Sequence, residues 1–156
     1  MPNLRSLSAS ERRALVQEAA ELAAEHFGDH GYNCAESALY GVATALRLPL
    51  DDAVLKAATP FGGGIGRAGC VCGALSGSVM ALGLALGRTT PDAAQKDLAY
   101  ERAQRLWQRF VERAGAEDCR ELNTLGFDLP DHKALCTRFV AIAAELAAEE
   151  LLGGGD

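Results

Sequence analysis

Cysteines give this chain its clearest potential for chemistry. Three of the five stand where the sequence predicts the start of a helix: Cys34, Cys72 and Cys119. A helix N-terminus presents unpaired N–H donors and a partial positive charge of about half an elementary charge. Such a site favours the thiolate over the thiol, and the thiolate is the form that attacks electrophiles and binds metals. Three thiols placed in this way, with Cys136 as a fourth, predict one shared cysteine site.

Capping pairs predict the helix starts at two of these cysteines. The first is preceded by Asn33, and Glu36 lies three residues after that asparagine, which is a capping box with the thiol at the first helical position. Asp118 and Glu121 flank the third cysteine in the same way. The second cysteine instead follows a glycine-rich loop and opens a run of small residues. We therefore expect two thiols at capped helix ends and one at the entry to a helix from a loop.

Length, charge and cysteine content narrow the class of protein. With 156 residues, 49% of them apolar, the chain predicts a single helical domain over 1–152 and a flexible tail over 153–156. The net charge of −6 argues against nucleic acid or an anionic membrane as a partner. Residues 1–13 contain no apolar signal-peptide segment, so we expect a cytoplasmic, reducing location. There, cysteines favour metal ligands or redox groups over structural disulfides.

The elements that must position the cysteines are helices. Apolar periodicity, capping pairs and the positions of glycine and proline predict an all-α fold. We expect a helical bundle of about five to six helices, with a Gly-rich loop before a central small-residue helix. The helices are expected at about 8–27, 34–47, 51–59, 72–86, 90–114 and from 130 onward, with a short helical turn from 119.

Further expectations concern the ends and faces of two of these helices. Gly28 is expected to cap the first helix. On the long helix that starts near 90, Trp107 and Phe110 are expected in the core. The charged residues of the same helix are expected on a solvated face: Glu101, Arg102, Arg105, Arg109, Glu112 and Arg113.

One stretch is long enough and uncharged enough to be considered as a membrane span. Residues 68–87 carry no charge, but five of them are glycine, two are serine and two are cysteine, so their hydrophobicity is modest. We interpret the stretch as a central helix that neighbouring helices approach closely, and we expect no contact with a membrane. A flat helix of small residues also makes a homodimer a candidate assembly.

The segment around Cys72 resembles a known family. Residues 62–67 (GGGIGR) and 72–77 (CGALSG) are similar to the CGAxxG core of a family of redox-active proteins with four separated cysteines. The family's cysteines match Cys34, Cys72, Cys119 and Cys136, so the resemblance covers most of the chain. It implies that these four are metal ligands or redox thiols and that Cys70 is an additional, auxiliary thiol. Split-Soret cytochromes c are similar in this segment and carry an iron–sulfur centre besides haem. Because this chain has no C-x-x-C-H, we expect no haem.

Three interpretations of the four cysteines stay open. The first is electron transfer through an iron–sulfur cluster, [2Fe–2S] or [4Fe–4S], with most of its support coming from the resemblance. The second is thiol–disulfide oxidoreductase chemistry by the same cysteines, with Cys70 only two residues from Cys72. The third is a non-enzymatic accessory or binding protein whose cysteines hold a structural zinc or pack as small apolar groups. The redox partner is left unassigned.

Residues near the cysteines are assigned supporting roles. The loop 62–66 lacks the Gly-Lys-Ser/Thr ending of a phosphate-binding loop. We expect Gly63 and Gly64 to let backbone N–H groups approach a buried anion, such as a thiolate or sulfide, and Arg67 to add positive charge. His30 and His132 each precede a cysteine by four residues, and we interpret both as solvated side chains.

Overall fold

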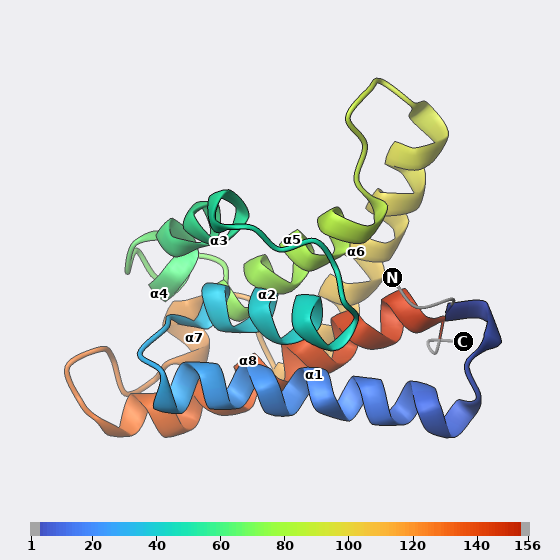
Figure 1. Cartoon of the computed structure of the whole chain (residues 1–156). Helices are drawn as coiled ribbons and strands as arrows, with labels where there is room; N and C mark the ends of the chain where they lie inside the picture. Colours follow the sequence, from blue (N-terminus) through green and yellow to red (C-terminus); the bar gives the residue numbers. More distant parts are fainter. Residues whose placement is uncertain (1–3, 154–156) are drawn as a thin grey trace.

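The computed structural model describes residues 4–153, which fold into helices (Figure 1). The elements are η1 (Leu4–Ser6), α1 (Ala9–Asp29), α2 (Cys34–Ala45), α3 (Asp52–Ala58), η2 (Thr59–Phe61), α4 (Gly62–Ile65), α5 (Gly73–Leu86), α6 (Ala93–Ala114), α7 (Cys119–Leu122) and α8 (Asp131–Leu152). Residues 4–153 contain no strand, so the all-α prediction is confirmed. With the one-turn segments α4 and α7, the number of helices is slightly above the predicted five to six.

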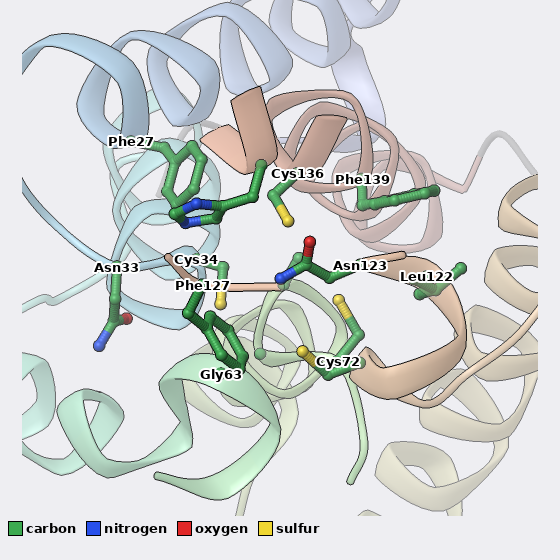
Figure 2. Close-up of a pocket in the computed structure, with 14 residues that line it drawn as sticks. Phe27, Asn33, Cys34, Gly63, Cys72, Leu122, Asn123, Phe127, Cys136 and Phe139 are labelled. Atoms are coloured by element: carbon green, nitrogen blue, oxygen red, sulfur yellow. The ribbon is translucent and has the colours of Figure 1, made fainter. Parts of the chain in front are cut away.

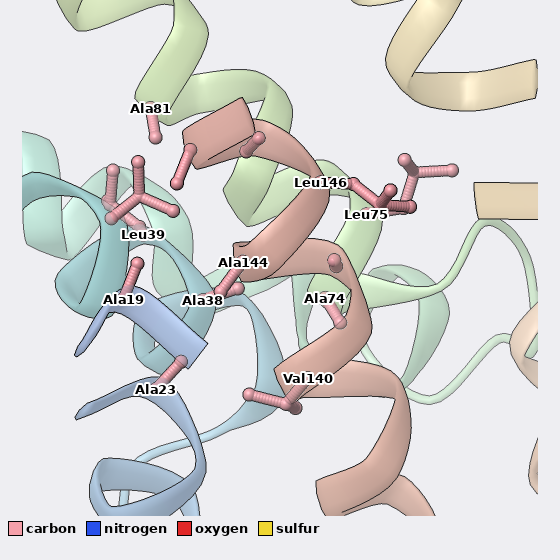
Figure 3. Close-up of a cluster of buried hydrophobic side chains, with 14 of the residues drawn as sticks. Ala19, Ala23, Ala38, Leu39, Ala74, Leu75, Ala81, Val140, Ala144 and Leu146 are labelled. Carbon is pink, nitrogen blue, oxygen red and sulfur yellow. The ribbon is translucent and has the colours of Figure 1, made fainter. Parts of the chain in front are cut away.

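The core of the fold is formed by α1, α2, α5 and α8, with α6 packed beside two of them. Helix α1 packs against α2 and α8, both of these contact α5, and α6 lies against α5 and α8. The contact faces are rich in alanine (Figure 3), and six of these alanines are completely buried: Ala19, Ala23, Ala38, Ala74, Ala81 and Ala144. Small side chains let helix backbones approach closely. A Cβ added at Gly41 of α2 would lie 2.5 Å from the carbonyl oxygen of Ala19 on α1.

The glycines of α5 serve a contact within the chain. A Cβ at Gly77 would collide with the backbone of Ala35, and a Cβ at Gly73 would collide with the sulfur of Cys34, so both glycines face the start of α2. Gly83, in contrast, has open space where its Cβ would lie. The close approach expected of this helix is therefore made to α2, and a homodimer stays a prediction.

Side-chain caps set the starts of α2 and α6. Asn33 and Glu36 form the predicted capping box at the start of α2. Helix α6 begins later than expected, because Asp92 caps it by accepting a hydrogen bond from Gln95 N at 3.0 Å. The prediction for Gly28 is wrong. Helix α1 continues to Asp29, and the chain turns through Gly31, whose φ is +75°.

The predicted faces of α6 need two corrections. Phe110 is fully buried as expected, but Trp107 is 42% exposed at the edge of a groove beside α5. The arginines are not all solvated. Arg102, Arg105 and Arg109 pair with Glu150 of α8, which is buried. The second error arises because α8 supplies a carboxylate that no feature of α6 itself could indicate.

Two expectations concern the uncharged stretch and the end of the chain. Of the helices within residues 4–153, none is both long enough and apolar enough to cross a membrane. Gly153 ends α8 in the left-handed conformation, with φ of +74°. The remainder of the predicted flexible tail, 154–156, lies outside the residues that the structure describes.

Candidate functional site

A pocket at one end of the helical bundle brings together four of the five cysteines (Figure 2). Cys34 is the first residue of α2, Cys72 is the N-cap of α5, Cys119 is the first residue of α7, and Cys136 lies in the second turn of α8. The cavity volume is about 100 Å³, several times the roughly 10–15 Å³ that one water needs. Much of the remaining wall is apolar: Phe27, Ala74, Leu122, Phe127 and Phe139. Four distant segments thus deliver one thiol each to a small, mostly apolar cavity.

The capping box of α2 also positions the glycine-rich loop. Asn33 Oδ1 accepts a hydrogen bond from Glu36 N at 3.0 Å, while Asn33 Nδ2 donates to the carbonyl oxygen of Thr59 at 2.9 Å. The hydroxyl of Thr59 donates to Glu36 Oε1 at 2.6 Å. Because both capping side chains are bonded to Thr59, the start of α2 and the entry to the loop are held together.

Glycines make room for the sulfur of Cys34. Backbone amides of Gly63, Ala35 and Gly73 act on this sulfur and lower the pKa of Cys34, against the larger raising effect of burial, so the loop and the first turn of α5 both present N–H groups to it. A side chain at Gly73 would occupy the position of the sulfur itself. The amides of Gly63 and Gly73 thus act on the same thiol, and the binding of an anion by these amides stays a prediction.

The glycine-rich loop is an uninterrupted left-handed turn. All residues from 63 to 67 have positive φ, including Ile65 at +63° and Arg67 at +65°. L-residues other than glycine pay about 1–2 kcal/mol each in this conformation, which explains why glycine occupies the other three positions. Gly64 is buried outside the pocket, and a Cβ there would lie 2.7 Å from the Cβ of Cys119. The two non-glycine residues of the turn therefore carry backbone strain close to the cysteine site.

Helix α7 is attached to the segment before Cys72 by backbone hydrogen bonds. Cys119 N donates to the carbonyl oxygen of Cys70 at 2.7 Å, Arg120 N donates to that of Gly69 at 3.1 Å, and Cys72 N donates to that of Glu117 at 2.7 Å. The capping box predicted at Asp118 is absent: its side chain makes no capping hydrogen bond, and Glu121 N donates instead to the backbone carbonyl oxygen of Asp118 at 3.0 Å. The same three bonds bring Cys72 and Cys119 to one wall of the pocket.

A family model described as "Putative redox-active protein (C_GCAxxG_C_C)" matches residues 32–150, which include all four pocket cysteines. The chain belongs to this family. The family's description supports a cysteine-based redox role for the chain. An uncharacterized protein of Archaeoglobus fulgidus is 31% identical over 127 residues, which cover 76% of this chain and 84% of that protein. No solved structure matches the chain.

Burial raises the pKa of every pocket thiol in this member of the C_GCAxxG_C_C family. It raises the pKa of Cys72 to about 12 and that of Cys136 to about 11, with repulsion from Cys34 as the next cause. The pKa values of Cys34 and Cys119 are also raised, chiefly by burial. The expectation that helix N-termini favour the thiolates is therefore wrong for these groups, because desolvation in an apolar cavity outweighs the amide donors.

Besides Gly64, two more of the predicted supporting residues lie outside the pocket. Cys70 is half-buried, and its sulfur accepts a hydrogen bond from Arg120 Nη2 at 3.7 Å. Arg67 is exposed in an adjoining hollow, with its guanidinium 5.7 Å from the centre of the Phe127 ring. Phe127 lines both this hollow and the cysteine pocket. The guanidinium that donates to a cysteine sulfur is that of Arg120, whereas the sequence had indicated Arg67. Apart from its position next to Cys119, nothing in the sequence indicated that Arg120 would contact a cysteine.

The two histidines are placed differently. His30 is exposed as expected, with Nε2 3.4 Å from a carboxylate oxygen of Glu25. His132 is half-buried and lines the pocket, and its Nδ1 lies 2.7 Å from the carbonyl oxygen of Leu129. The interpretation of His132 as a merely solvated side chain is wrong, because the loop before α8 folds it over the cavity beside Phe127.

Asn123 is a pocket residue that sequence reasoning missed. It is 7% exposed, it follows the last residue of α7, and neither its side-chain oxygen nor its side-chain nitrogen has a hydrogen-bond partner. An asparagine after a short helical turn is common, so the sequence carries no signal of this role. Among the described residues, no three His, Cys, Asp or Glu side chains are grouped closely enough to hold a single metal ion.

Proposed function

We propose that this protein transfers single electrons through an iron–sulfur cluster bound by Cys34, Cys72, Cys119 and Cys136. The observation that carries the proposal is the meeting of four thiols from four segments at one small, mostly apolar cavity. Four cysteine thiolates are the usual ligand set of [2Fe–2S] and [4Fe–4S] clusters, which gain and lose one electron at a time.

The surroundings of Cys34 fit an anionic sulfur site. The backbone amides of Gly63, Ala35 and Gly73 lower the pKa of Cys34, although burial raises it more. Because a Cβ at Gly73 would take the space of that sulfur, only glycine permits the contact. Backbone donors of this kind stabilise negative charge on sulfur without adding a charged side chain to the pocket. The aromatic wall, including Phe27 and Phe139, limits the access of water.

The raised thiol pKa values favour metal binding over thiol–disulfide exchange. Exchange needs a free thiolate as the nucleophile, and a thiol such as Cys72 with a pKa of about 12 supplies very little of it at neutral pH. A metal, in contrast, displaces the proton when it binds. Release of protons on binding is therefore part of the proposal.

The test is purification of the full chain without oxygen, or its reconstitution with iron and sulfide. We expect visible absorption, iron and acid-labile sulfide in equal amounts, and an electron paramagnetic resonance signal in one of the two oxidation states. A colourless, metal-free protein with a reducible disulfide among the pocket cysteines would replace this proposal with thiol–disulfide chemistry. Stoichiometric zinc under the same conditions would replace it with a structural metal.

Cys70 supplies a matched control for the ligand assignment. It is a half-buried cysteine only two residues from Cys72, but it does not line the pocket. We expect Cys70→Ala to retain iron and sulfide, while Cys34→Ala and Cys119→Ala lose most of both. Equal retention by all three variants would contradict the assignment of ligands.

A further inference from the structure

Asn123 has a buried amide that the fold itself does not use. Its backbone N–H donates to the carbonyl oxygen of Cys119 at 2.7 Å, and its own carbonyl oxygen accepts from Gly126 N at 3.3 Å. The backbone of this residue is thus fully engaged in ending α7 and starting the next turn. The side chain is 7% exposed, and both of its polar atoms lack a partner. Burying an unpaired amide costs stability, so its retention calls for a group that it binds.

The amide of Asn123 points into the cysteine pocket. Figure 2 shows it in the middle of the cavity, between the labelled sulfurs of Cys34, Cys72 and Cys136. Of the other polar side chains in the wall, Asn33 is engaged at both its oxygen and its nitrogen, and Nδ1 of His132 lies 2.7 Å from the carbonyl oxygen of Leu129. The pocket wall contains no lysine, arginine, aspartate or glutamate. The neutral amide of Asn123 is therefore well placed to meet whatever lies between the thiols.

We infer that Asn123 Nδ2 donates a hydrogen bond to a sulfur atom of the cluster in this pocket, an inference that rests on the proposed function. A sulfide or a metal-bound thiolate is an anionic acceptor without protons of its own, so it matches an N–H donor. Hydrogen bonds to cluster sulfurs favour the reduced, more negative state and raise the reduction potential. Asn123 acts as a binding and tuning residue, and it does not transfer a proton or an electron.

The test compares wild-type protein with Asn123→Leu, which keeps a similar side-chain shape but removes both polar atoms. In the metal-free protein we expect the thermal midpoint to stay the same or to rise, because an unpaired buried amide is removed. In the cluster-bound protein we expect a lower reduction potential and a several-fold faster loss of iron to a chelator. The opposite signs of the two effects distinguish a binding residue from a structural one.

Ser78→Ala is the matched control. Ser78 is also fully buried without a hydrogen-bond partner, but it lies in the middle of α5 and does not line the pocket. We expect its removal to leave potential and iron retention unchanged. Asn123→Ala, which adds no branch, checks that the effects of Asn123→Leu come from loss of the amide and not from a poor fit.

Each remaining outcome decides against the inference. If both Asn123 variants bind the cluster with the potential and iron loss of the wild type, the amide has no role toward it, although the proposed function stands. If both variants destabilise or unfold the metal-free protein, the side chain is structural. If the wild-type protein takes up no iron and sulfide, the proposed function fails and this inference fails with it.

Discussion

Two buried polar regions of this protein differ in whether their polar groups have partners within the chain. Between α6 and α8, the buried carboxylate of Glu150 is surrounded by guanidinium groups: its Oε1 accepts from Arg109 Nη1 at 3.0 Å, and its Oε2 lies 3.3 Å from Arg105 Nε. In the cysteine pocket, the amide of Asn123 is buried without any partner, and four thiols are held in an apolar cavity. In the first region the buried charge is paired within the chain, although Oε2 of Glu150 accepts no hydrogen bond.

The difference separates polar groups that build the fold from polar groups that bind a ligand. A buried charge is tolerated only when it is paired, and the arginines of α6 supply that pairing for Glu150. A buried amide without a partner lowers stability, and folding alone gives no reason to keep it. If this contrast holds, substitutions in the two regions will change different measured quantities.

The largest effect on stability is expected at Glu150. In Glu150→Gln the charge is lost while three half-buried guanidinium groups remain close together. We expect the free energy of unfolding to fall by about 3 kcal/mol, as for other buried ion pairs that lose one partner. Urea unfolding measures this change, and the iron content of the pocket should not respond.

The exposed pair of Arg113 and Glu145 is the control for this comparison. It joins the same two helices, with an Nη1–Oε1 distance of 2.9 Å, but its side chains are 43% and 34% exposed. We expect Arg113→Gln to cost only about 0–1 kcal/mol. A loss in Glu150→Gln no larger than this would show that the buried cluster does not stabilise the fold.

A smaller effect on stability, but a large one on the cysteine pocket, is expected for Gly73→Ala. The new Cβ would collide with the sulfur of Cys34 and lie 2.9 Å from the carbonyl oxygen of Phe61. We expect a loss of about 1–3 kcal/mol in unfolding free energy, together with loss of iron and sulfide uptake. Calorimetry and iron assays on the same preparation measure both changes.

Gly83→Ala provides a control within the same helix. Nothing lies within 4 Å of a Cβ at Gly83, so alanine should stabilise α5 by up to about 1 kcal/mol. Iron uptake should be unchanged. If both glycine substitutions behaved alike, contact with Cys34 would not be what requires glycine at position 73.

The smallest expected effect is the change in unfolding free energy for each unit of pH. Burial raises the pKa of Cys72 from its ordinary value of 9.0 to about 12, so above pH 9 the unfolded chain loses this proton before the folded chain does. The stabilising contribution is complete below pH 9 and is lost as pH rises toward 12, by about 1 kcal/mol for each pH unit. Urea unfolding of reduced, metal-free protein at pH 8 to 11 measures the slope.

Cys72→Ala identifies the source of that slope. This variant should show a flatter dependence of unfolding free energy on pH than the wild type. The ion-pair region should contribute little to the slope over this range: although burial opposes it, hydrogen bonds to Glu149 and Glu150 raise the pKa of Arg109 above its ordinary value. An unchanged slope in Cys72→Ala would contradict the assignment of the raised pKa to this thiol.

Identical local patterns led to a correct and an incorrect prediction. Asn33 and Glu36 form a capping box, in which Asn33 Oδ1 accepts from Glu36 N and Glu36 Oε2 accepts from Asn33 N. The same pattern at Asp118 gives no side-chain cap: Glu121 N donates to the backbone carbonyl oxygen of Asp118, and the carbonyls of Gly69 and Cys70 accept from the two amides before it. Sequence spacing relates donors and acceptors within one turn of a helix. It carries no information about acceptors on a segment some fifty residues away.

The sequence by itself determined the helices, the presence of a Gly-rich loop before α5 and the thiols at or near helix starts, because helix formation and capping depend on residues three or four positions apart. Only the tertiary structure decided which thiols meet and which polar groups join them. It left Cys70 outside the pocket, folded His132 and Asn123 into its wall, and raised the thiol pKa values. The physical reason is that burial and desolvation arise from contacts between distant segments, which no local spacing encodes.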